Sequence, residues 1–148
     1  MNGAMPALPD PDHDHVFYDG VPAKRLFAWL VDVVIVVAIT FVLGLLTLSV
    51  LWWLWPVTFF AVNFLYRAGT IASGSATWGM RLMNIELRGA TGARLSTGEA
   101  MVHTLAYLVA TGFVILQLIS ILMMGFGARH QGLHDLLIGS VAINRPGI

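Results

Sequence analysis

The side chain best placed to do chemistry in this 148-residue sequence is an aspartate inside a long apolar segment. Residues 26–66 contain one acid, Asp32, and no lysine or arginine, and Arg25 lies immediately before them. The seven-residue spacing puts both side chains on one helical face, about 10 Å apart along the axis, which is too far for a direct salt bridge. An acid within a membrane costs about 3 kcal/mol and normally faces protein or water beside a partner. We therefore expect Asp32 to meet a polar group on another helix.

Asn63 and His103 are the polar side chains expected at the depth of Asp32 on two other helices. We expect these three residues to converge in one polar cluster, with Arg25 at its mouth. Burial raises the pKa of a carboxylate, and a nearby positive charge lowers it. A buried carboxylate beside a base can therefore exchange a proton for a small cation. The alternative is a polar contact that only fixes the packing of the helices.

A second polar group lies near the C-terminus. His130 and His134 are four residues apart and share a face if the segment is helical, as two zinc ligands would. That face offers no evident third ligand. The preferred interpretation is that Asp135 anchors the chain's return to the membrane by binding backbone amides or a basic residue. The acidic and histidine-rich residues 10–15 resemble many flexible tails, so we predict no metal site and no cofactor.

Several classes of protein are excluded or disfavoured. The absence of cysteine excludes disulfides, thiolate metal sites and cysteine nucleophiles. There is no serine-hydrolase elbow, no zinc-protease motif and no nucleotide-binding fingerprint, so we predict that the protein is not an enzyme. A formal net charge of zero gives no basic field for nucleic acid.

The apolar segment also predicts the architecture. Hydrophobic residues make up 57% of the chain and charged residues 11%, against about 25% in soluble proteins. A bilayer core needs about 20 residues of helix, so residues 26–66 are too long for one span and suit two. We predict an all-α integral membrane protein with three transmembrane helices, at about residues 26–46, 50–68 and 102–126.

The third apolar segment has two interpretations. As one tilted span it places Arg129 and Arg145 outside the cell, which the preference of basic residues for the cytoplasm disfavours. Alternatively, Gly112 breaks it into two short helices that return to the inner face. The single span is preferred, and a pairing of Asp135 with Arg25 would favour the broken helix.

The remaining segments connect these spans. Residues 1–23 are rich in proline and acids, which predicts a disordered tail, and residues 145–148 form the C-terminal end. Basic residues before the first span and after the second predict a cytoplasmic N-terminus and a cytoplasmic middle loop. In that loop, residues 77–81 can begin an interfacial helix, and residues 84–95 suggest a small hairpin.

These motifs resemble the RDD family of small bacterial membrane proteins, which is named for one arginine and two aspartates. The arginine corresponds to Arg25, and the aspartates to Asp32 and Asp135. The segment Thr77-Trp-Gly-Met-Arg81 resembles the family's loop motif, in which the matching positions are Thr77, Gly79 and Arg81. The resemblance covers about residues 18–144, and the transmembrane domain is taken as 24–144. Met80, Ser140 and His103 depart from the family's usual residues.

The resemblance implies a multi-pass protein of the bacterial cytoplasmic membrane with a transport role, namely cation or proton exchange in some members. Three spans rarely enclose a pathway, so we expect a homo-oligomer in the lipid bilayer that moves a small cation or proton. The alternative is a non-transporting scaffold or assembly partner whose polar cluster is structural.

Overall fold

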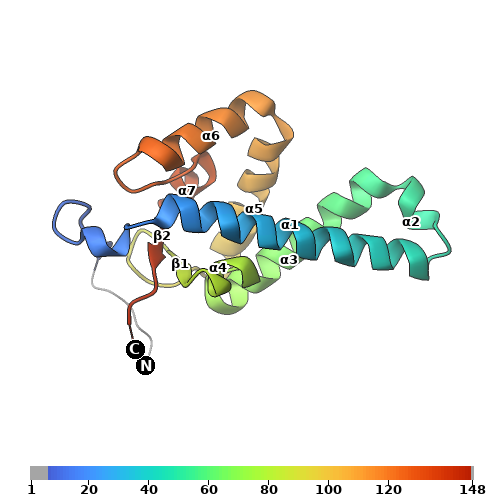
Figure 1. The fold of residues 1–148 in the computed structure, drawn as a ribbon, viewed down its shortest axis with the longest axis horizontal. Coiled ribbons are helices and arrows are strands. Elements are labelled where there is room, and N and C mark those ends of the chain that lie inside the picture. The colour runs from blue at the N-terminus through green and yellow to red at the C-terminus, as the bar shows by residue number, and fades with distance from the viewer. Residues whose placement is uncertain (1–6, 148) are drawn as a thin grey trace.

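The computed structural model describes residues 7–147, and the first six residues of the predicted tail lie outside this range. The fold is mostly helical, with two short strands (Figure 1). The elements in chain order are η1 (His15–Phe17), α1 (Val21–Leu46), α2 (Val50–Trp53), α3 (Trp55–Gly74), α4 (Trp78–Leu82), β1 (Ile85–Arg88), α5 (Thr97–Gly112), α6 (Val114–Phe126), α7 (Leu133–Ile138) and β2 (Val141–Asn144).

Helices α1 and α3 form a long hairpin, as the apolar segment predicts, but the boundaries differ from the prediction. Helix α1 begins at Val21 rather than near residue 26, because Pro22 suits the first turn of a helix. The second predicted span is two helices, α2 and α3, since Pro56 starts a new helix at its first turn. Trp52 of α2 stacks on Phe41 of α1 with 5.3 Å between ring centroids, which closes the end of the hairpin.

The third apolar segment is not one straight helix. It forms α5 and α6, which are bent by 117° relative to each other at Phe113, next to Gly112. The two helices make an inverted V beside α1 (Figure 1). By length and composition, the described residues contain one helix able to cross a membrane, η1 with α1, or two if α5 and α6 count as one span. The single span at residues 102–126 is therefore replaced by the broken form.

A two-stranded antiparallel sheet corrects the all-α prediction. Strand β1 pairs with β2 rather than with residues 93–95, so the predicted local hairpin is wrong. Ile85 lies opposite Asn144, and Arg88 lies opposite Val141. The alternation at residues 84–88 indicates a strand, but the partner comes from the far end of the chain. The sheet thereby holds the C-terminal segment against the middle loop.

The segment before α1 is packed rather than free. Tyr18 is buried against Val141 and Ile143 of β2, and its hydroxyl donates a hydrogen bond to the carbonyl of Pro9 at 2.8 Å. Asn144 binds the carbonyls of Val16 and Asp19 through its amide nitrogen, at 2.9 Å each. The part of the predicted tail that the structure describes therefore contacts β2, although Val16 is 67% exposed. Both ends of the described chain lie near the start of α1 (Figure 1).

Candidate functional site

Asp32 anchors the middle loop to α1. Its Oδ1 accepts hydrogen bonds from the Tyr66 hydroxyl at 2.7 Å and the Gly79 backbone N–H at 2.9 Å. Its Oδ2 accepts one from the Thr77 hydroxyl at 2.6 Å. Charge-assisted hydrogen bonds of this kind are about twice as strong as neutral ones. The carboxylate is 1% exposed and joins α1, α3 and α4 at one point.

The loop motif provides the shape that this contact needs. Thr77 caps α4, because its side-chain oxygen also accepts the backbone N–H of Met80 at 3.2 Å. A side chain at Gly79 would place its Cβ 2.1 Å from the carbonyl oxygen of Ala28, so only glycine lets α4 rest directly on α1. Arg81 binds the carbonyls of Ala76 and Thr70, which ties α4 to the end of α3.

Arg67 is a buried cation. The sequence interpretation used it only as one of the basic residues that indicate the cytoplasmic side of the membrane. Its Nε donates to Oδ1 of Asn63 at 3.0 Å, and its guanidinium lies 4.0 Å from the centre of the Tyr107 ring. Its Nη2 is 3.8 Å from Oδ2 of Asp32, which is an ion pair but beyond hydrogen-bond distance. Asn63 therefore positions the arginine and does not contact Asp32 in any recorded hydrogen bond.

Asp135 is the centre of a second polar cluster. Its Oδ2 lies 2.7 Å from Nη1 of Arg25 and accepts the Gly132 N–H at 2.9 Å. Its Oδ1 lies 2.8 Å from Nε2 of His103 and 3.3 Å from the Ser140 hydroxyl. A carboxylate can only accept here, so Nε2 of His103 carries the proton. The arginine and the second aspartate of the motif thus form a salt bridge that joins α1 to α7.

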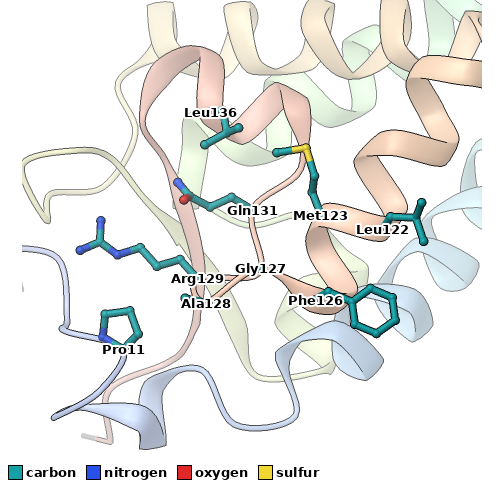
Figure 2. A pocket seen from close by; sticks show the side chains of 9 residues that line it. All are labelled: Pro11, Leu122, Met123, Phe126, Gly127, Ala128, Arg129, Gln131 and Leu136. Atoms are coloured by element: carbon teal, nitrogen blue, oxygen red, sulfur yellow. The ribbon is translucent and has the colours of Figure 1, made fainter.

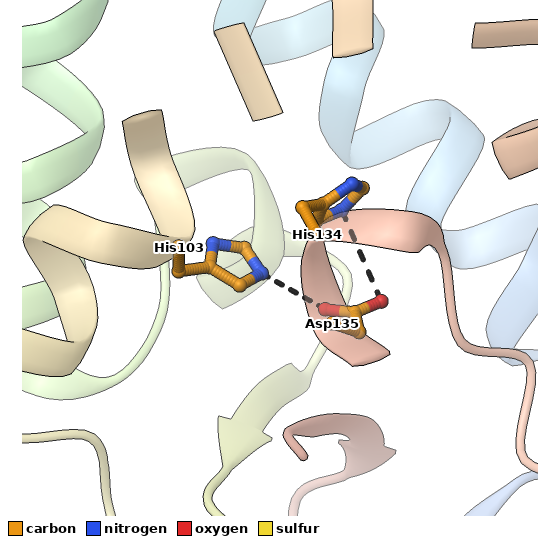
Figure 3. Close-up of side chains that lie close together, drawn as sticks. All are labelled: His103, His134 and Asp135. Atoms are coloured by element: carbon orange, nitrogen blue, oxygen red, sulfur yellow. Dashed lines mark hydrogen bonds and ion pairs between the residues drawn. The ribbon is translucent and has the colours of Figure 1, made fainter. Parts of the chain in front are cut away.

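His103, His134 and Asp135 could in principle hold a metal ion, because their ligand atoms lie within 4.8 Å of one another (Figure 3). The donor set does not fit, however. The Arg25 guanidinium contacts both Oδ2 of Asp135 and Nε2 of His134, at 2.7 and 3.2 Å, so a fixed cation already uses these acceptors. His130 points elsewhere and meets the carbonyl of Met124 at 2.9 Å. Arg25 therefore supplies the positive charge that faces these two acceptors.

A cavity of about 480 Å³ separates the two clusters. Arg25 and His103 of the Asp135 cluster and Asp32 and Arg67 of the other all line it. Apolar side chains of α1 and α6, among them Leu26 and Ile121, complete the wall. Trp29 and Tyr107 meet across it, with Nε1 donating to the hydroxyl oxygen at 2.8 Å. The cavity wall is thus largely apolar, and charged side chains of both clusters meet at it.

The structure thus brings the predicted residues together differently. Asp32 and His103 share the cavity but belong to separate clusters, and Arg25 lies with Asp135 rather than at the mouth of the Asp32 site. Asn63 is behind Arg67 and is absent from the cavity lining. The sequence interpretation did not include Tyr66, Arg67 and Tyr107 in the site. The four-residue spacing of Asn63 and Arg67, which puts them on one face of a helix, was the sequence feature that could have indicated Arg67.

Acidification is expected to destabilise the fold through His134. Burial lowers the pKa of His134 to about 3, although the nearby Asp135 carboxylate opposes this. The unfolded chain therefore binds a proton below pH 6.5 that the folded chain does not, so stability falls as the pH drops from 6.5 toward 3. Between pH 8 and pH 5 the loss from this residue should be about 2 kcal/mol.

Thermal unfolding in detergent at several pH values measures this loss. His134→Gln, which keeps an acceptor for Arg25, should flatten the dependence between pH 8 and pH 5. His13→Gln, at an exposed position in the N-terminal segment, should leave it unchanged. An unaltered slope in His134→Gln would show that another group causes the acid sensitivity.

Comparison with known proteins agrees with the motif. Residues 20–139 match the RDD family. The matched range includes Arg25, Asp32 and Asp135 as well as the loop motif at residues 77–81. No curated protein and no solved structure matches the chain. The match spans well over half of the sequence and confirms the resemblance drawn from Arg25, Asp32 and Asp135. The chain therefore belongs to the RDD family.

Proposed function

We propose that this RDD protein is a multi-pass protein of the bacterial cytoplasmic membrane that moves small cations or protons as a homo-oligomer. Membrane insertion is supported by the family and by the apolar surface of the long helices. Val34 is 67% exposed midway along α1, and Ile115 is 73% exposed on α6. Apolar side chains exposed all along helices of this length suit lipid rather than water.

In place of three spans we propose two, α1 and α3, with α5 and α6 as a re-entrant hairpin. Only α1 has the length and composition of a span by itself, so α3 is proposed as a span because it packs along α1 as its partner in the hairpin. Helices α5 and α6 have 16 and 13 residues, so each is shorter than the roughly 20 residues that cross a bilayer. The salt bridge between Arg25 and Asp135 supports a return of the chain to the side where α1 begins. Lysine and arginine are absent from the connection between α1 and α3, which favours a cytoplasmic location for both ends of the chain.

The observation that carries the transport proposal is the loose pair of Arg67 and Asp32 at the cavity wall. Their closest atoms are 3.8 Å apart, and Arg67 is held in place by Asn63 and Tyr107 as well as by Asp32. A cation that enters the cavity can compete with Arg67 for Oδ2 of Asp32. Arg67 then serves as an internal counter-ion that neutralises the carboxylate between transport events. Two spans cannot enclose a pathway, so neighbouring subunits would complete it.

Flux measurements in liposomes test this function. Asp32→Asn keeps the shape and loses the charge, so cation-driven proton flux should fall at least tenfold. Thr77→Val removes a hydrogen bond to the same carboxylate and leaves its charge, so a properly folded Thr77→Val protein should retain most of the flux. Equal losses in the two variants at equal thermal stability would mean that loop anchoring, not charge, matters.

A non-transporting scaffold is the second candidate, and one observation favours it. Both oxygens of Asp32 already bind donors from within the chain, as a purely structural carboxylate would. On this alternative, purified wild-type protein should show no flux above empty liposomes. Asp32→Asn should then lower the thermal stability without any change in ion movement.

A further inference from the structure

An open groove lies on the outer side of the α6–α7 connection, away from the charged cavity. Its volume is about 720 Å³ (Figure 2). Leu122, Met123 and Phe126 of α6 and Leu136 of α7 form an apolar wall, and Arg129 and Pro11 of the N-terminal segment line the other end (Figure 2). The groove is therefore amphipathic along its length, with one basic side chain beyond a set of apolar ones.

Arg129 differs from every other lysine and arginine within residues 7–147. Each of the others has a recorded hydrogen bond or ion pair, namely Lys24, Arg25, Arg67, Arg81, Arg88, Arg94 and Arg145. For Arg129 no hydrogen bond or ion pair to a described residue is recorded. A half-buried guanidinium has five donors to satisfy. Its guanidinium is therefore available to an anion from outside the chain.

Two acids of the neighbouring N-terminal segment, Asp10 and Asp14, have partners within that segment. Asp10 accepts the backbone N–H of Asp12 at 2.8 Å and pairs with His13 at 3.5 Å. Asp14 accepts the backbone N–H of Asp10 at 3.2 Å. None of these carboxylates lies within the 4.0 Å of Arg129 that defines an ion pair. They therefore leave its charge uncompensated at short range.

The apolar wall decides what kind of anion fits. Phe126 is 88% exposed and Leu136 is 50% exposed, so the groove offers lipid-compatible surface beyond its cationic end. A free phosphate or an acidic peptide would leave this surface uncovered. A phospholipid matches both ends, because its phosphate suits an arginine fork and its acyl chain suits the leucines and the phenylalanine. Basic residues at the cytoplasmic surface also attract anionic lipids.

We propose that this groove is a binding site for an anionic phospholipid, with the phosphate on Arg129 and an acyl chain along Leu122, Phe126 and Leu136. The proposal rests on the membrane location argued above, but it does not depend on transport. The bound lipid would stabilise the connection between α6 and α7, which contains His130 and also Gly132, whose N–H donates to Asp135.

Native mass spectrometry of the detergent-purified protein tests the site, with phosphatidylglycerol, phosphatidylcholine and soluble glycerol phosphate added separately. The wild type should bind phosphatidylglycerol about fivefold more tightly than phosphatidylcholine, the factor expected for one basic residue near a lipid headgroup. Arg129→Gln should abolish this preference. Arg94→Gln removes an equal charge from the exposed middle loop and should preserve it. Phe126→Ala should weaken the binding of both lipids by the same factor.

Three results would overturn the proposal. Equal losses in Arg129→Gln and Arg94→Gln would indicate general charge attraction rather than a site. Tight binding of glycerol phosphate alone would identify a free phosphate ligand. Protection of the groove by a second copy, seen as a dimer that Phe126→Ala dissociates, would identify a protein interface. Because binding is measured without flux, these results are separate from any failure of the transport proposal.

Discussion

Replacing Arg25 by methionine is expected to destabilise the protein by about 3–5 kcal/mol, the usual cost of removing one partner from a buried ion pair. Asp135 is fully buried, and Arg25 Nη1 lies 2.7 Å from its Oδ2. Burial raises the pKa of Asp135, but the charge of Arg25, together with His134 and the hydrogen bond from His103, outweighs burial and holds the pKa well below its usual range. Without the guanidinium, the carboxylate must remain charged without its cation or take up a proton. Both outcomes cost free energy, and α7 should separate from α1.

Thermal unfolding in detergent measures the loss, and a second substitution separates charge from packing. Arg25→Met with Asp135→Asn removes both charges and should recover more than half of the lost stability, because the two residues are coupled. Lys24→Met removes a neighbouring positive charge whose one hydrogen-bond partner within residues 7–147 is Asn144, and it should cost less than about 1 kcal/mol. Destabilisation by Lys24→Met as large as that by Arg25→Met would contradict a specific role for the salt bridge.

Gly79→Ala is expected to cost about 3 kcal/mol through a clash and lost hydrogen bonds. The added Cβ would lie 2.1 Å from the Ala28 carbonyl oxygen and 2.8 Å from Oδ1 of Asp32. The carbonyl belongs to the backbone of α1 and cannot turn away, so α4 must move. That movement breaks the bond from Gly79 N–H to Asp32 and pulls Thr77 away from the same carboxylate.

A matched control is available in α3. A Cβ at Gly69 meets nothing within 4 Å, and glycine is a poor residue inside a helix. Gly69→Ala should therefore raise the stability by about 0.5–1 kcal/mol. Unfolding curves that show Gly79→Ala to be as stable as the wild type would mean that α4 does not rest on α1 as described.

Helix positions along the chain were predictable, but the rotation of each helix and the partner of each polar residue were not. The apolar segment marks a two-helix hairpin, and Asp32 stands out in it by residue type alone. Depth along a helix does not fix which face meets which neighbour. Asp32 therefore turned toward Tyr66, Thr77 and Gly79, whereas the prediction paired it with Asn63 and His103.

Contacts between distant parts of the chain account for the other differences. The break at Phe113 brings α7 back to α1, and this gives His103 and Arg25 the same partner, Asp135. A hydropathy pattern cannot distinguish a 25-residue span from two shorter helices of the same composition. Residues 84–88 alternate as a strand does, yet their partner is β2, more than 50 residues later, which no local pattern identifies.

The central claim is that the cavity between the two arginine–aspartate clusters is part of the transport pathway. The chain contains no cysteine, and the side chain of Gln117 of α6 lines the cavity without a hydrogen bond to any other residue of 7–147. The most direct measurement is therefore proton or cation flux in liposomes that contain Gln117→Cys, before and after a positively charged, membrane-impermeant thiol reagent. We predict that modification of Gln117→Cys abolishes flux, and that a high substrate concentration slows the modification. The flux of Thr91→Cys, in the exposed loop, should not change when the same reagent is added. Complete modification of Gln117→Cys with undiminished flux would contradict the claim.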